Sequence, residues 1–324
     1  MNFYYLVLFF CSLPTGFHAM TPVPLESATN AISNSQLKVI IKNPNVLEDY
    51  ITQGIITPGD KIKENKIHYS LLGYAARNGL LQAAELLIKH HADVNHASYF
   101  PEKFTPLYLA LTSHNRDIAQ LLIKHGADIN LTNGGLHATV LHALAQDPES
   151  SYLKWALDSG ANPNVFSLGK TPLHYAVKAK LIMNVKLLHQ YGASITIGSE
   201  TPLHLAAGYN SDLPIVIYLI DKGADLNART AICNSTPLHF AVSLGKTEIV
   251  EYLLYSGAQR NICNHEGKTP LEMVGQNSQS AQIKELLTNP KAPLLSDNIR
   301  SIVLDIWTNK SIISQLLNRE IGKK

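Results

Sequence analysis

One short phrase recurs along the chain and constrains its fold more than any other feature. The phrase is Thr-Pro-Leu-His, followed about 15 residues later by a pair of leucines and then Gly-Ala-Asp-x-Asn. Its copies begin at positions 105, 139, 171, 201, 236 and 269, with a degenerate first copy, Ser-Leu-Leu-Gly, at position 70. The intervals are 35, 34, 32, 30, 35 and 33 residues. Such a period is typical of stacked units that bury their apolar faces only against one another.

The residue types within a copy predict a helix, a turn and a second helix. The threonine hydroxyl can cap a first helix, and proline suits its first turn, where an N–H would be unpaired anyway. A glycine after the second helix permits the left-handed backbone that ends it, and His91 replaces this glycine in the first copy at some expected cost in stability. We expect the signature histidines to form structural hydrogen bonds between repeats. The leucine pairs should bury against adjacent repeats.

Seven such copies closely resemble the ankyrin repeat, in which a turn and two antiparallel helices make one unit, and the resemblance covers about residues 70–289. It implies an all-α solenoid of about seven helix-turn-helix repeats with short finger loops and terminal capping helices. The tetratricopeptide repeat lacks the Thr-Pro-Leu-His start and the Gly-Ala-Asp turn. We expect a linker over 20–34, a partial repeat or cap over 35–69, and a helical cap or tail over 290–324.

An apolar run from Phe3 to Leu13 opens the chain. It is shorter than the roughly 20 residues that span a bilayer, so we interpret residues 1–19 as a cleavable signal peptide. No Lys or Arg precedes the run, and Phe17 is bulky for a cleavage site after Ala19. The alternative is an apolar helix packed on the first unit. The first interpretation predicts an exported protein, in the periplasm or a host cell, and the second a cytoplasmic one.

Composition narrows the class of partner. Hydrophobic residues make up 45% of the chain and charged ones 16%, so the chain can bury a core. The net charge of +2 lacks the clustered basic excess of a nucleic-acid binder. Three cysteines are too few for a disulfide framework, although Cys233 and Cys263, in successive fingers, could pair in an exported protein.

No catalytic or metal-binding motif accompanies the repeats. The 14 histidines show no ligand spacing such as His-Glu-x-x-His, and no phosphate-binding glycine loop or nucleophile elbow is present. We therefore predict no enzymatic activity, no catalytic residues, no cofactor and no metal.

The resemblance implies a monomeric protein-binding module whose partner docks on a concave face formed by fingers and first helices. Aromatic side chains are enriched at binding hot spots, which favours the finger with Phe100 and Phe104. The candidate finger residues are Tyr99, Phe100, Phe104, Phe166 and Lys170, and the candidates from first helices are Thr112, Ser113, Lys178, Tyr209 and Leu244.

Three alternatives stay open at this point. The array could target an activity housed in the terminal segments, or it could be a plain cytosolic or periplasmic scaffold. A signal-like start on such an array is also similar to secreted ankyrin-repeat proteins of intracellular bacteria that bind host proteins. In each case we expect no stable membrane insertion after the signal is removed.

Overall fold

The structure is a computed structural model that describes residues 32–64, 66–98, 103–134, 137–209, 212–275, 279–289 and 295–306. The expected signal peptide and the candidate residues Tyr99 and Phe100 lie outside these ranges. The chain divides into two compact units, Met1–Ala127 and Asp128–Lys324. None of the described helices is long and apolar enough to cross a membrane.

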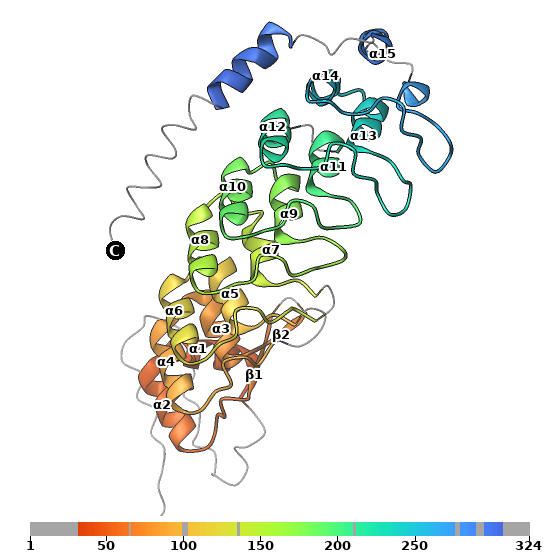
Figure 1. Cartoon of the computed structure of the whole chain (residues 1–324). Helices are drawn as coiled ribbons and strands as arrows, with labels where there is room; N and C mark the ends of the chain where they lie inside the picture. Colours follow the sequence, from red (N-terminus) through yellow and green to blue (C-terminus); the bar gives the residue numbers. More distant parts are fainter. Residues whose placement is uncertain are drawn as a thin grey trace, which may run out of the picture. The chain divides into compact units, whose positions relative to one another are not determined.

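The first unit contains six helices and one hairpin within its described residues (Figure 1). These are α1 (Asn34–Ile40), α2 (Pro44–Thr52), β1 (Lys61–Glu64), β2 (Ile67–Ser70), α3 (Leu71–Asn78), α4 (Leu81–Lys89), α5 (Pro106–Thr112) and α6 (Arg116–Lys124). Helices α2, α4 and α6 pack side by side, and α3 packs on α5. The segment expected to form a partial repeat or cap over 35–69 holds two helices and a hairpin.

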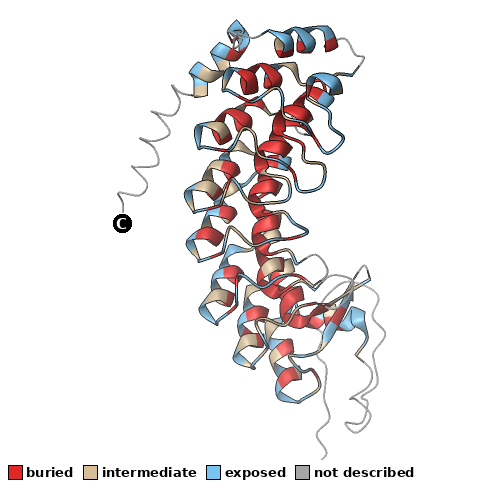
Figure 2. Cartoon of the chain, turned by 45° about the vertical axis from the view of Figure 1, so that its right-hand side comes forward, coloured by how far each residue is buried: buried red, intermediate tan, exposed pale blue. Residues whose placement is uncertain are grey.

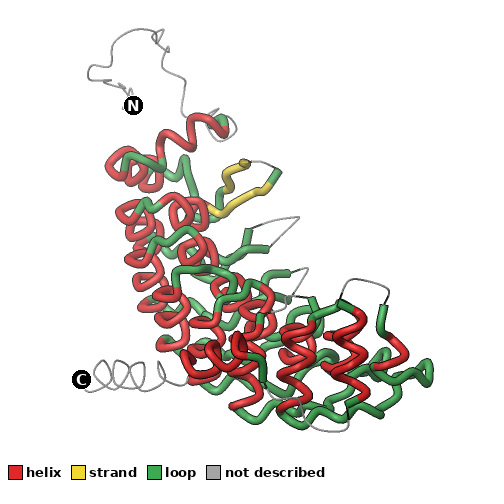
Figure 3. The backbone as a smooth tube through the Cα atoms, turned by 90° about the horizontal axis from the view of Figure 1, so that it is seen from above, coloured by secondary structure: helices red, strands yellow, loops and turns green. Residues whose placement is uncertain are grey.

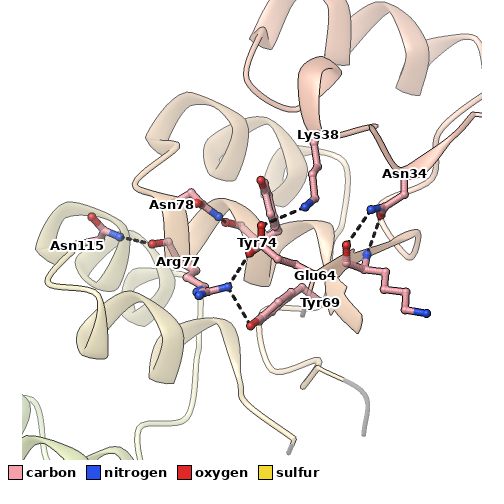
Figure 4. Close-up of polar contacts among 9 residues, drawn as sticks. Asn34, Lys38, Glu64, Tyr69, Tyr74, Arg77, Asn78 and Asn115 are labelled. Carbon is pink, nitrogen blue, oxygen red and sulfur yellow. Dashed lines mark hydrogen bonds and ion pairs between the residues drawn. The ribbon is translucent and has the colours of Figure 1, made fainter. Parts of the chain in front are cut away.

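A polar network joins this hairpin to the helices around it (Figure 4). The Glu64 carboxylate accepts hydrogen bonds from Lys38 of α1 at 3.0 Å and from Arg77 of α3 at 2.7 Å. The Asn34 side chain donates to the Lys63 carbonyl and accepts from the Lys63 N–H, both at 2.7 Å. Because these bonds satisfy the outer edge of β1, they fix the strand against α1.

The second unit repeats one arrangement of paired helices. First helices are α7 (Val140–Leu144), α9 (Pro172–Lys178), α11 (Pro202–Ala207) and α13 (Pro237–Ser243). Second helices are α8 (Ser150–Asp158), α10 (Ile182–Gln190), α12 (Leu213–Asp221), α14 (Thr247–Tyr255) and α15 (Ser280–Thr288). Each set forms one layer of neighbouring helices, with the finger loops extending from the N-terminal ends of the first helices (Figures 1 and 3). In the last copy the first helix is a 3-10 helix, η2 (Leu271–Met273).

The core lies between the two layers of helices, where buried residues concentrate (Figure 2). Alanines recur on the first helices at one position, and all have no exposed surface: Ala75, Ala110, Ala176, Ala206 and Ala241. Their small side chains let neighbouring helices approach closely. The second leucine of the predicted pairs is also fully buried at Leu87, Leu122 and Leu188, as expected for residues that one repeat alone could not cover.

The predicted helix ends are confirmed with one change. The Thr105 hydroxyl accepts the Tyr108 N–H at 3.1 Å, as a capping threonine should. In copies with histidine a reciprocal bond is added, because the backbone N–H of Thr171 donates to His174 Nδ1 at 3.0 Å. The glycines after the second helices have φ between 86° and 101°, and His91 adopts a left-handed φ of 64°.

A last helical stretch, residues 297–306, packs on α14. Leu295 and Ile299 are buried, with 7% and 0% of their surface exposed. The Ser296 N–H donates to the buried Glu251 carboxylate, and the Asn298 side chain donates to Glu248. These contacts join the last helical stretch to α14.

Candidate partner-binding surface

Four signature histidines tie each first helix to the next finger. Their Nδ1 atoms accept the N–H of the preceding threonine, which leaves Nε2 to donate forward to a backbone carbonyl. His142 donates to Lys170, His174 to Glu200 at 2.8 Å, His204 to Ala228 and Ser235, and His239 to Lys268. The predicted structural role of these residues is confirmed.

Burial keeps these imidazoles neutral. It lowers the pKa of His142, His204 and His239, and it lowers the pKa of His174 to about 4. An imidazole with both nitrogens engaged by the backbone has no lone pair for a metal ion. Within the described part of the chain, no group of three or more His, Cys, Asp or Glu side chains could hold a metal.

Asparagines form a second link between repeats. The Asn164 side chain donates to the Gly192 carbonyl at 2.9 Å and accepts the Ser194 N–H at 2.8 Å. Asn130 makes the equivalent pair of bonds with Gly160 and Asn162. Together with the histidines, these bonds hold successive fingers in register.

Large apolar side chains are exposed mainly on the fingers and beside the first helices of the second unit. On fingers, Phe166 is 46%, Leu168 69% and Ile232 88% exposed. Beyond the first helices, Tyr209 is 65% and Leu244 42% exposed. The second helices of this unit show Met183 and Tyr255 as their large exposed apolar residues within the described ranges.

Tyr209 and Leu244 belong to one cluster with Phe240, which we call the helix-end cluster. The Tyr209 and Phe240 rings meet edge to face with centroids 5.9 Å apart, and Leu244 follows Phe240 by one helical turn. Gly208 leaves room beside them, because a Cβ there would lie only 3.0 Å from Phe240. An open pocket adjoins the cluster, lined by Leu213, Leu244, Gly245, Lys246, Thr247, Glu248, Ile249 and Gln279.

The other candidates occupy separate places. Phe104 is half-buried and stacks on Tyr108 with centroids 4.8 Å apart, while the Thr112 hydroxyl donates to the Tyr108 carbonyl. Ser113 and Lys178 are exposed, and Lys170 is half-exposed at the base of the finger that carries Phe166.

Sequence reasoning missed Tyr175, Leu168, Ile232 and Phe240. Tyr175 and Phe240 each follow a signature histidine, and that position was the available signal. The two thiols considered as a disulfide, Cys233 and Cys263, are both free.

Paired helices, left-handed glycine ends and finger-to-finger hydrogen bonds define a helical repeat protein. Models of the ankyrin repeat match residues 37–133 and 203–295, as sets of three copies, and 168–200, as a single repeat. These matches cover more than half of the chain, which therefore belongs to the ankyrin repeat family.

Solved structures and curated sequences agree with this assignment. The human ASB11 ankyrin repeat domain is 26% identical, with a TM-score of 0.58 over 68% of this chain and 99% of that one. The ankyrin repeat domain of Bcl-3 is 28% identical, with a TM-score of 0.56 over 66% and 97%.

Among curated sequences, human palmitoyltransferase ZDHHC13 is 28% identical over 48% of this chain and 31% of its own length. The fowlpox virus putative ankyrin repeat protein FPV031 is 35% identical over 38% of each chain. The chain thus spans about a third of the length of these curated relatives. Its similarity to a palmitoyltransferase does not assign that activity to this chain.

Proposed function

We propose that this chain is a monomeric, non-enzymatic module that binds a partner protein on the finger and first-helix surface of its repeats. The observation that carries the proposal is the exposure of Phe166, Leu168, Tyr209, Ile232 and Leu244 on this side of the second unit. The ankyrin fold is typically a non-catalytic interaction fold, and its elements here hold these side chains in place. Aromatic residues beside a pocket are common anchors of protein interfaces.

The helix-end cluster is the strongest candidate for such an anchor. Tyr209 is held by the Phe240 ring, and Leu244 also lines the adjoining pocket with Leu213. A partner side chain entering this pocket would bury apolar surface that the free protein leaves in water, which favours association. Phe104, by contrast, already stacks on Tyr108 and has less free surface to offer.

Photo-crosslinking tests this proposal. A benzophenone amino acid placed at Phe166 or Tyr209 should crosslink the same partner when the full chain is expressed in its native host. The same amino acid at Met183 or Tyr255, which are similarly exposed on second helices, should not. Crosslinks from the second-helix positions alone would contradict the proposal.

The place of action is a further part of the proposal and rests on the sequence. The apolar run at the start of the chain supports export, so the partner would be met in the periplasm or in a host cell, as for a secreted effector. N-terminal sequencing of the mature protein tests this part. An intact Met1 would support the cytoplasmic scaffold instead.

A further inference from the structure

The repeat at the centre of the second unit has an unusual charge balance. From Ser159 to Ser199 the chain contains four lysines and no aspartate or glutamate, although the whole chain has 25 acidic residues against 27 basic ones. This stretch includes the single repeat matched at 168–200. This local excess of positive charge stands out in a chain of low charge content.

Three of the four lysines lie on the finger, on the first helix and in the turn that follows this helix. Lys170 closes the finger turn through its bridge with Ser167, Lys178 is in the last turn of α9, and Lys180 follows in the turn before α10. The fourth, Lys186, is on the second helix α10, where its ammonium lies 5.9 Å from the centre of the Tyr218 ring.

The acidic groups of the neighbouring elements leave these three lysines unpaired. Glu200 follows on the next finger, Asp147 and Glu149 are in the turn between α7 and α8, and Asp212 precedes α12. Asp147 accepts the Glu149 N–H at 2.8 Å, and Asp212 accepts the Ile215 N–H at 3.1 Å. Among the described residues, no carboxylate forms an ion pair within 4.0 Å of Lys170, Lys178 or Lys180.

Apolar groups are interleaved with these charges. Phe166 and Leu168 are exposed on the finger that Lys170 closes, and Tyr175 is half-exposed one helical turn before Lys178. Leu168 has a left-handed φ of 50°, a conformation that glycine or asparagine adopts at lower cost. The fold therefore keeps Leu168 in a backbone conformation that L-residues disfavour, and it exposes the aliphatic side chain of this residue to water.

We propose that this surface, formed by Phe166, Leu168, Lys170, Tyr175, Lys178 and Lys180, binds an acidic segment of the partner protein. Partner carboxylates lie against the unpaired ammonium groups, and an apolar partner side chain covers Phe166 and Leu168. The proposal rests on the proposed function and specifies the chemistry of the partner. A protein is favoured over nucleic acid because large aliphatic and aromatic side chains accompany only three lysines.

Selection of peptides tests this chemistry directly. A random peptide library containing acidic sequences is displayed and selected on the full chain, and the enriched peptides are synthesised for titration. The proposal predicts sequences rich in Asp and Glu beside Leu, Phe or Trp. Charge reversal in a Lys170→Glu/Lys178→Glu variant should weaken their binding by at least about tenfold, whereas Lys284→Glu on α15 should leave it within about twofold. Raising the salt concentration should also weaken binding to the wild type.

The outcomes separate this proposal from the proposed function. An enriched set without acidic excess, no enrichment at all, or equal binding to the charge-reversed variant overturns the acidic-segment proposal. If the enriched peptides are not acidic but Phe166→Ala or Tyr209→Ala weakens their binding, the acidic-segment proposal fails and the proposed binding surface stands. A thymidine 20-mer that binds more tightly than every selected peptide, and that Lys170→Glu/Lys178→Glu releases, would assign the surface to nucleic acid.

Discussion

His91 occupies the position at the end of α4 where most other repeats have glycine. Its φ of 64° is left-handed, which costs an L-residue about 1–2 kcal/mol, partly offset because glycine is more disordered in the unfolded chain. We expect His91→Gly to raise the free energy of unfolding by about 0.5–1 kcal/mol in urea denaturation. Gly126→Ala is the matched control and should lower it, because its Cβ meets no atom within 4 Å but its φ is 87°. A neutral or destabilising His91→Gly would contradict this account of the helix end.

The buried histidines should make stability depend on pH. Burial lowers the pKa of His174 to about 4 from 6.5, so between these values the unfolded chain binds a proton that the folded chain excludes. The stabilisation is complete above pH 6.5 and is lost as the pH falls towards 4. At pH 5 we expect His174 alone to reduce the free energy of unfolding by about 2 kcal/mol relative to pH 7.5.

His174→Gln is the control for this pH dependence. Glutamine can also accept the Thr171 N–H and donate to the Glu200 carbonyl, but it does not titrate. Thermal unfolding at several pH values should show a shallower loss for this variant. Equal pH slopes for the variant and the wild type would show that His174 does not exclude the proton.

The structural roles of single residues were predictable where every copy of the repeat uses the same residue type for the same role. The histidine bonds and the left-handed glycines follow from the recurring phrase, because the same local geometry is needed in every copy. The role of the linking asparagines was not predicted, because the partners of Asn164, which are Gly192 and Ser194, belong to the next repeat. Gly198 was also missed, because its constraint depends on a contact between the end of its copy and the first helix of the same copy: a Cβ there would lie 2.7 Å from His174 Nε2 and 2.6 Å from the Glu200 carbonyl oxygen.

At the scale of elements, the asparagine links should contribute measurably to the packing of neighbouring repeats. Asn164→Ala leaves the Gly192 carbonyl and the Ser194 N–H without their partner, and we expect a loss of about 1–2 kcal/mol in urea denaturation. Asn261 occupies the equivalent place after the sixth repeat, and its side chain makes no hydrogen bond with the part of the chain that the structure describes. Asn261→Ala should therefore change stability by less than about 0.5 kcal/mol. Similar losses for both variants would contradict the role of the link.

The repeated helix pairs were predictable from the sequence, whereas the hairpin β1–β2 was not. Lys61–Glu64 is only four residues long and mostly charged, so its alternation is a weak signal for a strand. What stabilises it is tertiary: Asn34 completes its edge and Glu64 joins α1 to α3. The copy that ends before Thr201 is only 30 residues long, yet α11 still packs between α9 and α13. Gly198 permits the shorter finger of this copy, because a Cβ there would clash with the Glu200 carbonyl oxygen.

For the whole molecule, the repeats predict the kind of function, which is the binding of a partner protein. They do not predict the contacts between repeats that shape the proposed binding surface. In each unit the repeats present finger loops and first helices, and the sequence predicted these elements. It did not indicate that Tyr209 meets Phe240 or that Lys170 and Lys178 stay unpaired, because both facts depend on contacts between repeats. The low charge of the chain makes such a basic repeat stand out against the rest of the surface.

The central claim is that the partner binds the finger and first-helix side. The most direct test is the dissociation constant between the purified full chain and its crosslinked partner, measured by titration. We expect Phe166→Ala/Tyr209→Ala to weaken binding by at least about tenfold, and Met183→Ala/Tyr255→Ala, with similar exposed area on the second helices, to change it by less than about twofold. The reverse pattern, or equal affinity for all three proteins, would contradict the claim.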